Sequence, residues 1–232
     1  MKKVGIFRMS YIKLNPKVYP ADTWYGGDSF EVIRFPVSST FDQQNFDVRV
    51  SKTVLYNHSS FFTQLPNYQR TFVTLANQMT LKQQIRNQSL VDQLRPFQVL
   101  QLSGESLTEI EGIGSGFNLI HRNFVHCQLR LFSHKDCCAY QLTKQQVLLI
   151  VSLSPLVDVD LTPSNKYLKE CITLQESETL LIWDETIELS YFKAVMDPSS
   201  NYLCLGCFID FSYDEAMFHQ FIKHYQQFDS YI

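Results

Sequence analysis

Apolar and polar residues alternate along most of the chain, with the period of a β-strand that buries one face. In residues 46–51, for example, the even positions are apolar and the odd positions are polar. Similar strand-like runs occupy residues 70–75, 97–102, 117–122, 128–132, 147–153, 179–183 and 203–211, and turn-forming Pro, Gly, Asn and Ser separate them. Many short strands at this spacing predict an all-β fold of the sandwich or barrel type.

One segment near the C-terminus has the period of a helix instead. Residues 212–215 read Ser-Tyr-Asp-Glu, which matches a capping box. The apolar residues after it fall on one helical face: Phe218, Phe221, Ile222 and Tyr225. We therefore predict a single substantial helix over residues 213–226. The polar, Gln-rich residues 80–94 are interpreted as an excursion between strands, with a short helix as one form of it.

The composition is that of a globular chain with a preference for β structure. Of the 232 residues, 45% are hydrophobic and 19% are charged, which excludes a disordered chain. Aromatic residues make up 14% of the chain, and they favour pleated, half-buried surfaces. A net charge of −3 without a basic stripe provides no footprint for nucleic acid, so no nucleic-acid partner is expected.

No segment is expected to enter a membrane. The longest apolar runs, such as residues 147–151, are far shorter than the ~18 residues that a spanning helix needs. Arg8 interrupts the apolar residues 4–7, so the start of the chain does not resemble a signal peptide. Six cysteines without an export signal are interpreted as buried free thiols. We therefore expect a cytoplasmic protein.

Metal and cofactor motifs are missing from the sequence. The six histidines form no His-x-His pair, which would place two metal ligands on one face of a strand. Cys204 and Cys207 are three apart in a strand-like run, so they project to opposite faces, and no second pair accompanies them. The glycine-rich residues 112–116 lead into a strand and not into the helix of a phosphate-binding loop. No metal and no other cofactor are expected, and no residue is assigned a catalytic role.

Arginines on the predicted strands are the strongest candidates for a site. Arg49 shares one strand face with polar residues at positions 47 and 51, Asn118 and Arg122 share a face of another strand, and Arg70 opens a third. Converging arginines suit a carboxylate, because the guanidinium fork binds both of its oxygens. The alternative is structural: Arg49 would pair with the acid at position 47 or with Glu31, and the other two arginines would lie at the surface.

The stretch ADTWYGGDSFEVIRFP, residues 21–36, gathers polar and aromatic residues beside two glycines. Gly26 and Gly27 permit a tight turn and a close approach to a ligand. Trp24 supplies an apolar wall with a donor at its tip, and Glu31 is suited to hold an arginine in place. A hairpin that only closes the fold explains the glycines and the Trp but not the polar cluster, so we interpret the stretch as the rim of a pocket.

Several spaced segments resemble the HutD/Ves family, in the same order. TWYGGDSFEVIRFP resembles its Trp-(x)-Gly-Gly…Glu signature, and FDVRVSKTVLYNHSSFFTQLPNYQRTFVTL resembles a longer run of two strands. LRPFQVLQLSGES resembles its Phe…Gly-Asp hairpin, and GIGSGFNLIHR resembles its Asp-Phe-Asn-Leu-Met-x-Arg element. These matches are collinear over residues 11–125. Gly116 stands where the family usually has Asp, and Glu105-Ser106 replaces its usual Asp-Trp.

The resemblance implies an all-β bicupin: two antiparallel β-barrels of the RmlC-like jelly-roll type, residues 1–125 and 126–232, with one C-terminal helix. It also implies metal-independent binding of a small acidic metabolite, such as a formimino- or formylglutamate of histidine degradation, in a regulatory role. The expected ligand contacts lie in the N-terminal barrel: Trp24, Gly26, Gly27, Glu31, Arg49, His58, Arg70, Asn118 and Arg122.

Two alternatives remain open at this point. The chain could be a metal-free cupin enzyme, an isomerase or lyase that uses Glu31 or His58 as its acid or base. It could also be a protein-interaction module whose aromatic residues form a contact face. A homodimer through a free strand edge is compatible with each of these functions.

Overall fold

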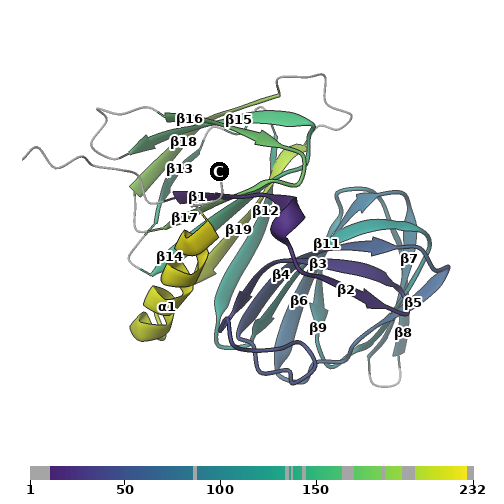
Figure 1. Ribbon diagram of the computed structural model, residues 1–232. Helices are drawn as coiled ribbons and strands as arrows, with labels where there is room; N and C mark the ends of the chain where they lie inside the picture. Colours follow the sequence, from purple (N-terminus) through teal and green to yellow (C-terminus); the bar gives the residue numbers. More distant parts are fainter. Residues whose placement is uncertain are drawn as a thin grey trace, which may run out of the picture. The chain divides into compact units, whose positions relative to one another are not determined.

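The computed structural model describes residues 11–85, 88–133, 136, 138–142, 145–163, 170–183, 186–194 and 202–228. Most of them lie in strands (Figure 1), and the chain splits into two compact units. The N-terminal unit is Pro16–Leu129, and the C-terminal unit combines strand β1, Tyr11–Leu14, with the chain from Arg130 onward. Division at residue 125 would separate β1 from its partner, strand β17.

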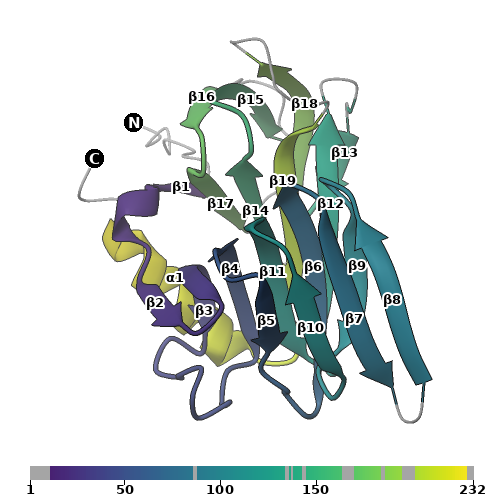
Figure 2. The ribbon, with the colours of Figure 1, turned by 90° about the vertical axis from the view of Figure 1, so that its right-hand side faces the viewer.

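The N-terminal unit consists of two antiparallel sheets, whose strands are labelled in Figures 1 and 2. The larger sheet has the order β2 Ala21–Trp24, β3 Gly27–Phe35, β4 Val48–Leu55, β11 Gly114–Arg122, β6 Tyr68–Ala76 and β9 Val99–Ser103. The smaller sheet has the order β5 Ser59–Phe62, β10 Leu107–Glu111, β7 Met79–Ile85 and β8 Gln88–Leu94. A short 3-10 turn, Pro16–Val18, precedes them.

Apolar side chains from both sheets meet inside the N-terminal unit. Leu55 and Phe72 of the larger sheet belong to one buried cluster with Leu81 and Ile110 of the smaller sheet. Burial of such side chains contributes about 1.5–3 kcal/mol each, so this cluster holds the two sheets face to face. The unit is thus a jelly roll of two sheets, and its strands do not form one continuous barrel.

The C-terminal unit repeats the two-sheet plan. Its first sheet has the order β1, β17 Thr179–Trp183, β14 Gln146–Ser152, β19 Tyr202–Asp210 and β12 His126–Ser133. Its second sheet has the order β13 Cys138–Gln141, β18 Thr186–Ala194, β15 Leu156–Pro163 and β16 Glu170–Gln175. One buried cluster joins Leu148 and Ile150 of the first sheet to Val157 and Val159 of the second.

The predicted helix is present as α1, Glu215–Gln226. Its N-cap is Asp214, whose side chain accepts a hydrogen bond from the backbone N–H of Met217 at 3.0 Å. The cap is therefore this Asp, two residues after the Ser of the predicted capping box. The predicted apolar face is buried, which confirms the helical period. Within the described part of the chain, no helix is long and apolar enough to cross a membrane.

The described residues of the segment 80–94 do not contain the short helix that the sequence left open. They lie in β7 and β8, which pair as antiparallel strands. Met79 and Leu81 of β7 face the core, whereas the first six residues of β8 are exposed. This exposure explains the polar composition of the segment, because of which the sequence pattern did not predict a strand there. β8 is the last strand at one edge of its sheet. The predicted homodimer could form by strand pairing there, and it stays a prediction.

Candidate functional site

Polar side chains line the middle of the larger sheet on its inner face, the face toward the smaller sheet. Arg49 and Ser51 of β4 point there, while Val48 and Val50 point to the other face. Glu31 of β3 lies opposite Ser51 on one side, and Asn118 of β11 lies opposite it on the other. Arg70 of β6 is one strand further along. All five residues are buried, so strand alternation builds a polar floor inside the unit.

A β-bulge adds Arg34 to this floor. The pairing of β3 with β4 shifts between Glu31 and Ile33. In a regular strand, residues three apart point to opposite faces. Because the bulge inserts one extra residue, Arg34 lies opposite Arg49, and its Nε is 3.5 Å from Oε1 of Glu31. Simple alternation cannot reveal the bulge, which is why Arg34 was not among the predicted residues.

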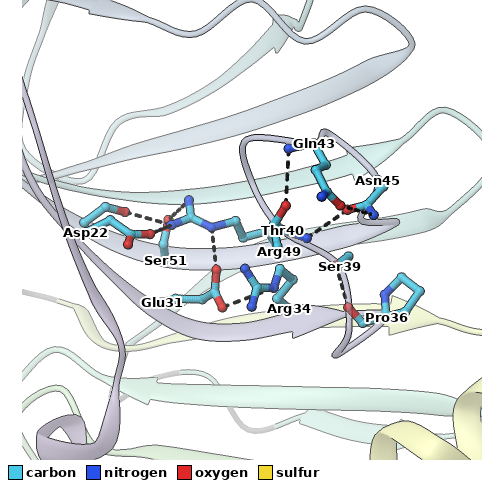
Figure 3. Close-up of polar contacts among 11 residues, drawn as sticks. Asp22, Glu31, Arg34, Pro36, Ser39, Thr40, Gln43, Asn45, Arg49 and Ser51 are labelled. Atoms are coloured by element: carbon cyan, nitrogen blue, oxygen red, sulfur yellow. Dashed lines mark hydrogen bonds and ion pairs between the residues drawn. The ribbon is translucent and has the colours of Figure 1, made fainter.

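Figure 3 shows the guanidinium of Arg49 surrounded by groups of the protein itself. Its Nε donates to Oε2 of Glu31 at 2.7 Å. Its Nη1 donates to the hydroxyl of Ser51 and its Nη2 to the hydroxyl of Ser29, both at 3.2 Å. The exposed carboxylate of Asp22 lies 3.9 Å from Nη2. Of the two interpretations of Arg49, the geometry matches the ion pair with Glu31.

Arg70 is in a different position. Its guanidinium lies over the ring of Phe62 at 4.3 Å, and its Nη2 donates to the carbonyl of Thr63 at 3.2 Å. Its buried Nε has no hydrogen-bond partner, and no carboxylate in the described part of the chain pairs with it. Burial, and secondly the charge of Arg49, lower the pKa of Arg70 to about 9. The side chain is therefore a buried cation at neutral pH without a counter-charge of its own.

A second polar group is incompletely paired nearby. The amide nitrogen of Asn118 donates to the hydroxyl of Thr53 at 2.9 Å, but its buried Oδ1 has no partner. Arg70 lies opposite Ile120, two residues from Asn118 on the adjacent strand. Residues so placed on one sheet face are diagonal neighbours, within reach of long side chains. Arg70 and Asn118, on adjacent strands, thus each contribute one buried polar atom without a hydrogen-bond partner.

These residues line a cavity of about 550 Å³ within the N-terminal unit, a size typical of small-molecule sites. Arg49, Arg70 and Asn118 belong to its floor. Much of the remaining lining is apolar: Trp24, Phe41, Phe61, Phe62 and Ile120. Two exposed acids, Asp22 and Asp42, also contribute. The cavity can therefore surround a small ligand with apolar walls and bring one of its polar groups to the arginines.

The segment between β3 and β4, residues 36–47, forms one wall of the cavity. The backbone N–H of Thr40 donates to Oδ1 of Asn45 at 2.8 Å, which folds the segment on itself (Figure 3). Arg122 holds its far end, because Nη2 donates to the carbonyl of Gln44 at 2.9 Å while the guanidinium lies over the ring of Tyr68 at 4.4 Å. Arg122 does not line the cavity and supports its wall.

The two glycines and His58 also lie outside the cavity lining. A Cβ at Gly27 would be 1.9 Å from the carbonyl oxygen of Val54, and one at Gly26 would be 2.2 Å from the ring of Trp24. The glycines therefore permit close packing within the hairpin, and Trp24 alone of that turn reaches the cavity. His58 is exposed between β4 and β5.

Other candidate chemistry receives little support from the geometry. Glu31, one proposed acid or base, is held between Arg49 and Arg34. Cys204 and Cys207 are buried free thiols, and burial raises the pKa of both. In the part of the chain that is described, no three His, Cys, Asp or Glu side chains are grouped to hold a metal ion.

Several lining residues were missed by the sequence analysis: Asp22, Ser29, Arg34, Phe41, Thr53, Phe61, Phe62 and Thr63. Ser29 and Thr53 had a usable signal, because they fall on the strand faces of Glu31 and Arg49. The others depend on the bulge, on the fold of residues 36–47, or on the approach of the smaller sheet. None of these has a local sequence pattern.

The model of the HutD family matches residues 17–196. HutD from Pseudomonas fluorescens SBW25 has a TM-score of 0.60 at 20% identity, covering 86% of this chain and 97% of that one. The conserved protein of unknown function PA5104 from Pseudomonas aeruginosa PAO1 has a TM-score of 0.66 at 19% identity, covering 86% and 98%. A mutant of Bacillus subtilis oxalate decarboxylase has a TM-score of 0.57 at 7% identity, covering 88% and 77%. No curated protein sequence matches the chain. These likenesses confirm the predicted cupin fold.

Proposed function

Because the chain belongs to the HutD family, we propose that it is a metal-independent binding protein for a small acidic metabolite. The cavity of the N-terminal unit holds the ligand, and the protein has a regulatory role in the cytoplasm. The observation that carries this proposal is Arg70, a buried cation in the cavity lining with which no carboxylate of the described residues pairs.

A buried charge without a counter-charge is costly for a folded protein. Arg49 has Glu31 as its partner, so the fork of Arg49 is already occupied. Arg70 has only the ring of Phe62 and one backbone carbonyl. An anionic ligand would supply the missing counter-charge, and its charge-assisted hydrogen bonds to a guanidinium are among the stronger ones in proteins. The anion subsite is therefore assigned to Arg70, with Arg49 next to it.

The unpaired Oδ1 of Asn118 narrows the class of ligand. It accepts a hydrogen bond, whereas the free Nε of Arg70 donates one. A ligand that carries a carboxylate and an N–H group a few bonds apart satisfies both. Formylglutamate and formiminoglutamate have this combination, and their small size suits a cavity of about 550 Å³. These two acids are the preferred candidates.

Isothermal titration of the purified chain with N-formyl-L-glutamate tests the proposal. We expect saturable binding of one ligand per chain, without turnover. At ligand concentrations of ~100 times the dissociation constant, the unfolding free energy should rise by about 2.7 kcal/mol. The dimethyl ester of the same compound is the matched control, because it keeps the N–H group and loses the charges. Equal binding of acid and ester, or no binding of either, would overturn the proposal.

A further inference from the structure

Gly116 lies outside the cavity lining but packs directly against an aromatic ring of the interior. It lies on β11, opposite Thr74 of β6, next to a shift in the pairing of these strands. A Cβ added there would be 2.2 Å from both Cε2 and Cζ of Phe72. The ring of Phe72 therefore occupies the space that any other residue at position 116 would need.

The ring of Phe72 leads from this glycine to Arg70. Phe72 contacts Phe62 edge to face, with the ring centroids 5.3 Å apart and the planes at 65°. Phe62 belongs to the smaller sheet, and its ring lies 4.3 Å from the guanidinium carbon of Arg70. Phe72 is fully buried and Phe62 nearly so. A chain of side-chain contacts thus crosses the interior. It leads from Gly116 and Phe72 in the larger sheet to Phe62 in the smaller sheet, and from Phe62 back to Arg70 in the larger sheet.

The direction of the Arg70 guanidinium depends on this chain of contacts. One face of the Arg70 guanidinium rests on Phe62, and Nη2 is tied to the carbonyl of the next residue, Thr63. Both supports come from the end of β5, so a shift of the Phe62 ring turns the guanidinium. Arg70 lines the cavity, so its orientation toward a bound anion depends on this support.

We propose that Gly116 is a positioning residue for the anion subsite, because it admits the Phe72 ring that holds Phe62 beneath Arg70. The inference rests on the proposed binding of an anion at Arg70.

Acetate is a suitable probe, and the Nε–Hε resonance of Arg70 in ¹⁵N-labelled protein is a suitable readout, assigned by its absence in Arg70→Met. In wild-type protein we expect acetate to shift this resonance saturably. Gly116→Ala should displace the Phe72 ring, alter the resonance before any acetate is added, and weaken acetate binding at least tenfold, or ~1.4 kcal/mol.

Gly206→Ala is the matched control. A Cβ at Gly206 would be 2.3 Å from Cε2 of Phe132, so this substitution presses a glycine against an aromatic ring in the C-terminal unit. Both variants should lose stability, but only Gly116→Ala should change the Arg70 resonance and acetate affinity. If Gly116→Ala does not fold, Phe62→Leu removes the supporting ring without a clash, and it should weaken acetate binding about 3- to 30-fold, the range of a desolvated cation–π contact.

The outcomes separate this inference from the proposed function. If acetate leaves the Arg70 resonance of wild-type protein unchanged, the anion subsite itself is wrong. If wild-type protein binds acetate and Gly116→Ala or Phe62→Leu binds it equally well, the subsite stands and the positioning role is overturned. Equal weakening by Gly206→Ala would also overturn it, because the effect would then follow stability alone.

Discussion

Substituting Arg70 by Met removes a buried cation and keeps most of the aliphatic stem that packs on Phe62. The lowering of its pKa to about 9 corresponds to a cost on the order of 5 kcal/mol for keeping the charge inside, at roughly 1.4 kcal/mol per pH unit. The substitution also removes the contact with the Phe62 ring and the hydrogen bond to the Thr63 carbonyl. These contribute about 1–2 and about 1.5–3 kcal/mol.

The difference predicts that Arg70→Met leaves the unfolding free energy of the unliganded protein unchanged or raises it by up to about 2.5 kcal/mol. Affinity for the acidic ligand should nevertheless fall about 30- to 1000-fold, or ~2–4 kcal/mol. Urea melts and isothermal titrations on the same preparation measure both quantities. A gain in stability together with a loss of binding would show that Arg70 contributes to ligand binding and not to the stability of the fold.

Arg122→Met is the matched control for this substitution. Arg122 also lies over an aromatic ring, that of Tyr68, and donates to a backbone carbonyl, that of Gln44, but it is less buried and lies outside the cavity. Its loss should lower stability by about 1–2 kcal/mol, because the contacts disappear without a comparable relief of desolvation. If Arg70→Met behaves like Arg122→Met, Arg70 is a structural residue and the argument for an anion subsite fails.

The stability difference between wild-type protein and Arg70→Met should also depend on pH. Below about pH 9 Arg70 is protonated in the folded and the unfolded chain, so the full cost of its burial is present. Above about pH 9 the folded chain has released the proton while the unfolded chain still binds it, so wild-type stability rises relative to the variant, by about 1.4 kcal/mol per pH unit, until the unfolded chain is deprotonated as well. A difference that stays constant from pH 7 to beyond pH 9 would refute the buried cation as its cause.

Two further substitutions address the other predicted residues. Arg49→Met should lower the unfolding free energy by about 2–4 kcal/mol, because Glu31 keeps only its longer contact with Arg34. It should weaken ligand binding less than Arg70→Met. Unchanged stability with abolished binding, in the same melts and titrations, would instead identify Arg49 as the residue that binds the ligand's carboxylate. His58→Ala should change neither the binding nor the unfolding free energy by more than about 0.5 kcal/mol, because the side chain is exposed outside the cavity lining. A large loss of binding would show that His58 contacts the ligand.

Much of the fold and part of the site were determined by local sequence pattern. Alternation of period two placed Arg49 and Ser51 on one face of β4 and the valines on the other, because successive side chains of a strand must point to opposite sides. The same rule put Asn118 on the inner face of β11, and the helical period of residues 218–225 predicted the buried face of α1. These features need no information from elsewhere in the chain.

Only the tertiary structure decided which of the arginines is left without a counter-charge. Glu31 reaches Arg49 because β3 and β4 are paired in one particular register, and Arg34 joins them because a bulge shifts that register. Among the described residues, Arg70 contacts the ring of Phe62 and the carbonyl of Thr63 and pairs with no acid. Strand pairing, bulges and contacts between sheets join residues that are distant in sequence, so no short pattern encodes them. The sequence supplied three candidate arginines, and long-range packing decided that Arg49 pairs with Glu31 while Arg70 packs on the ring of Phe62.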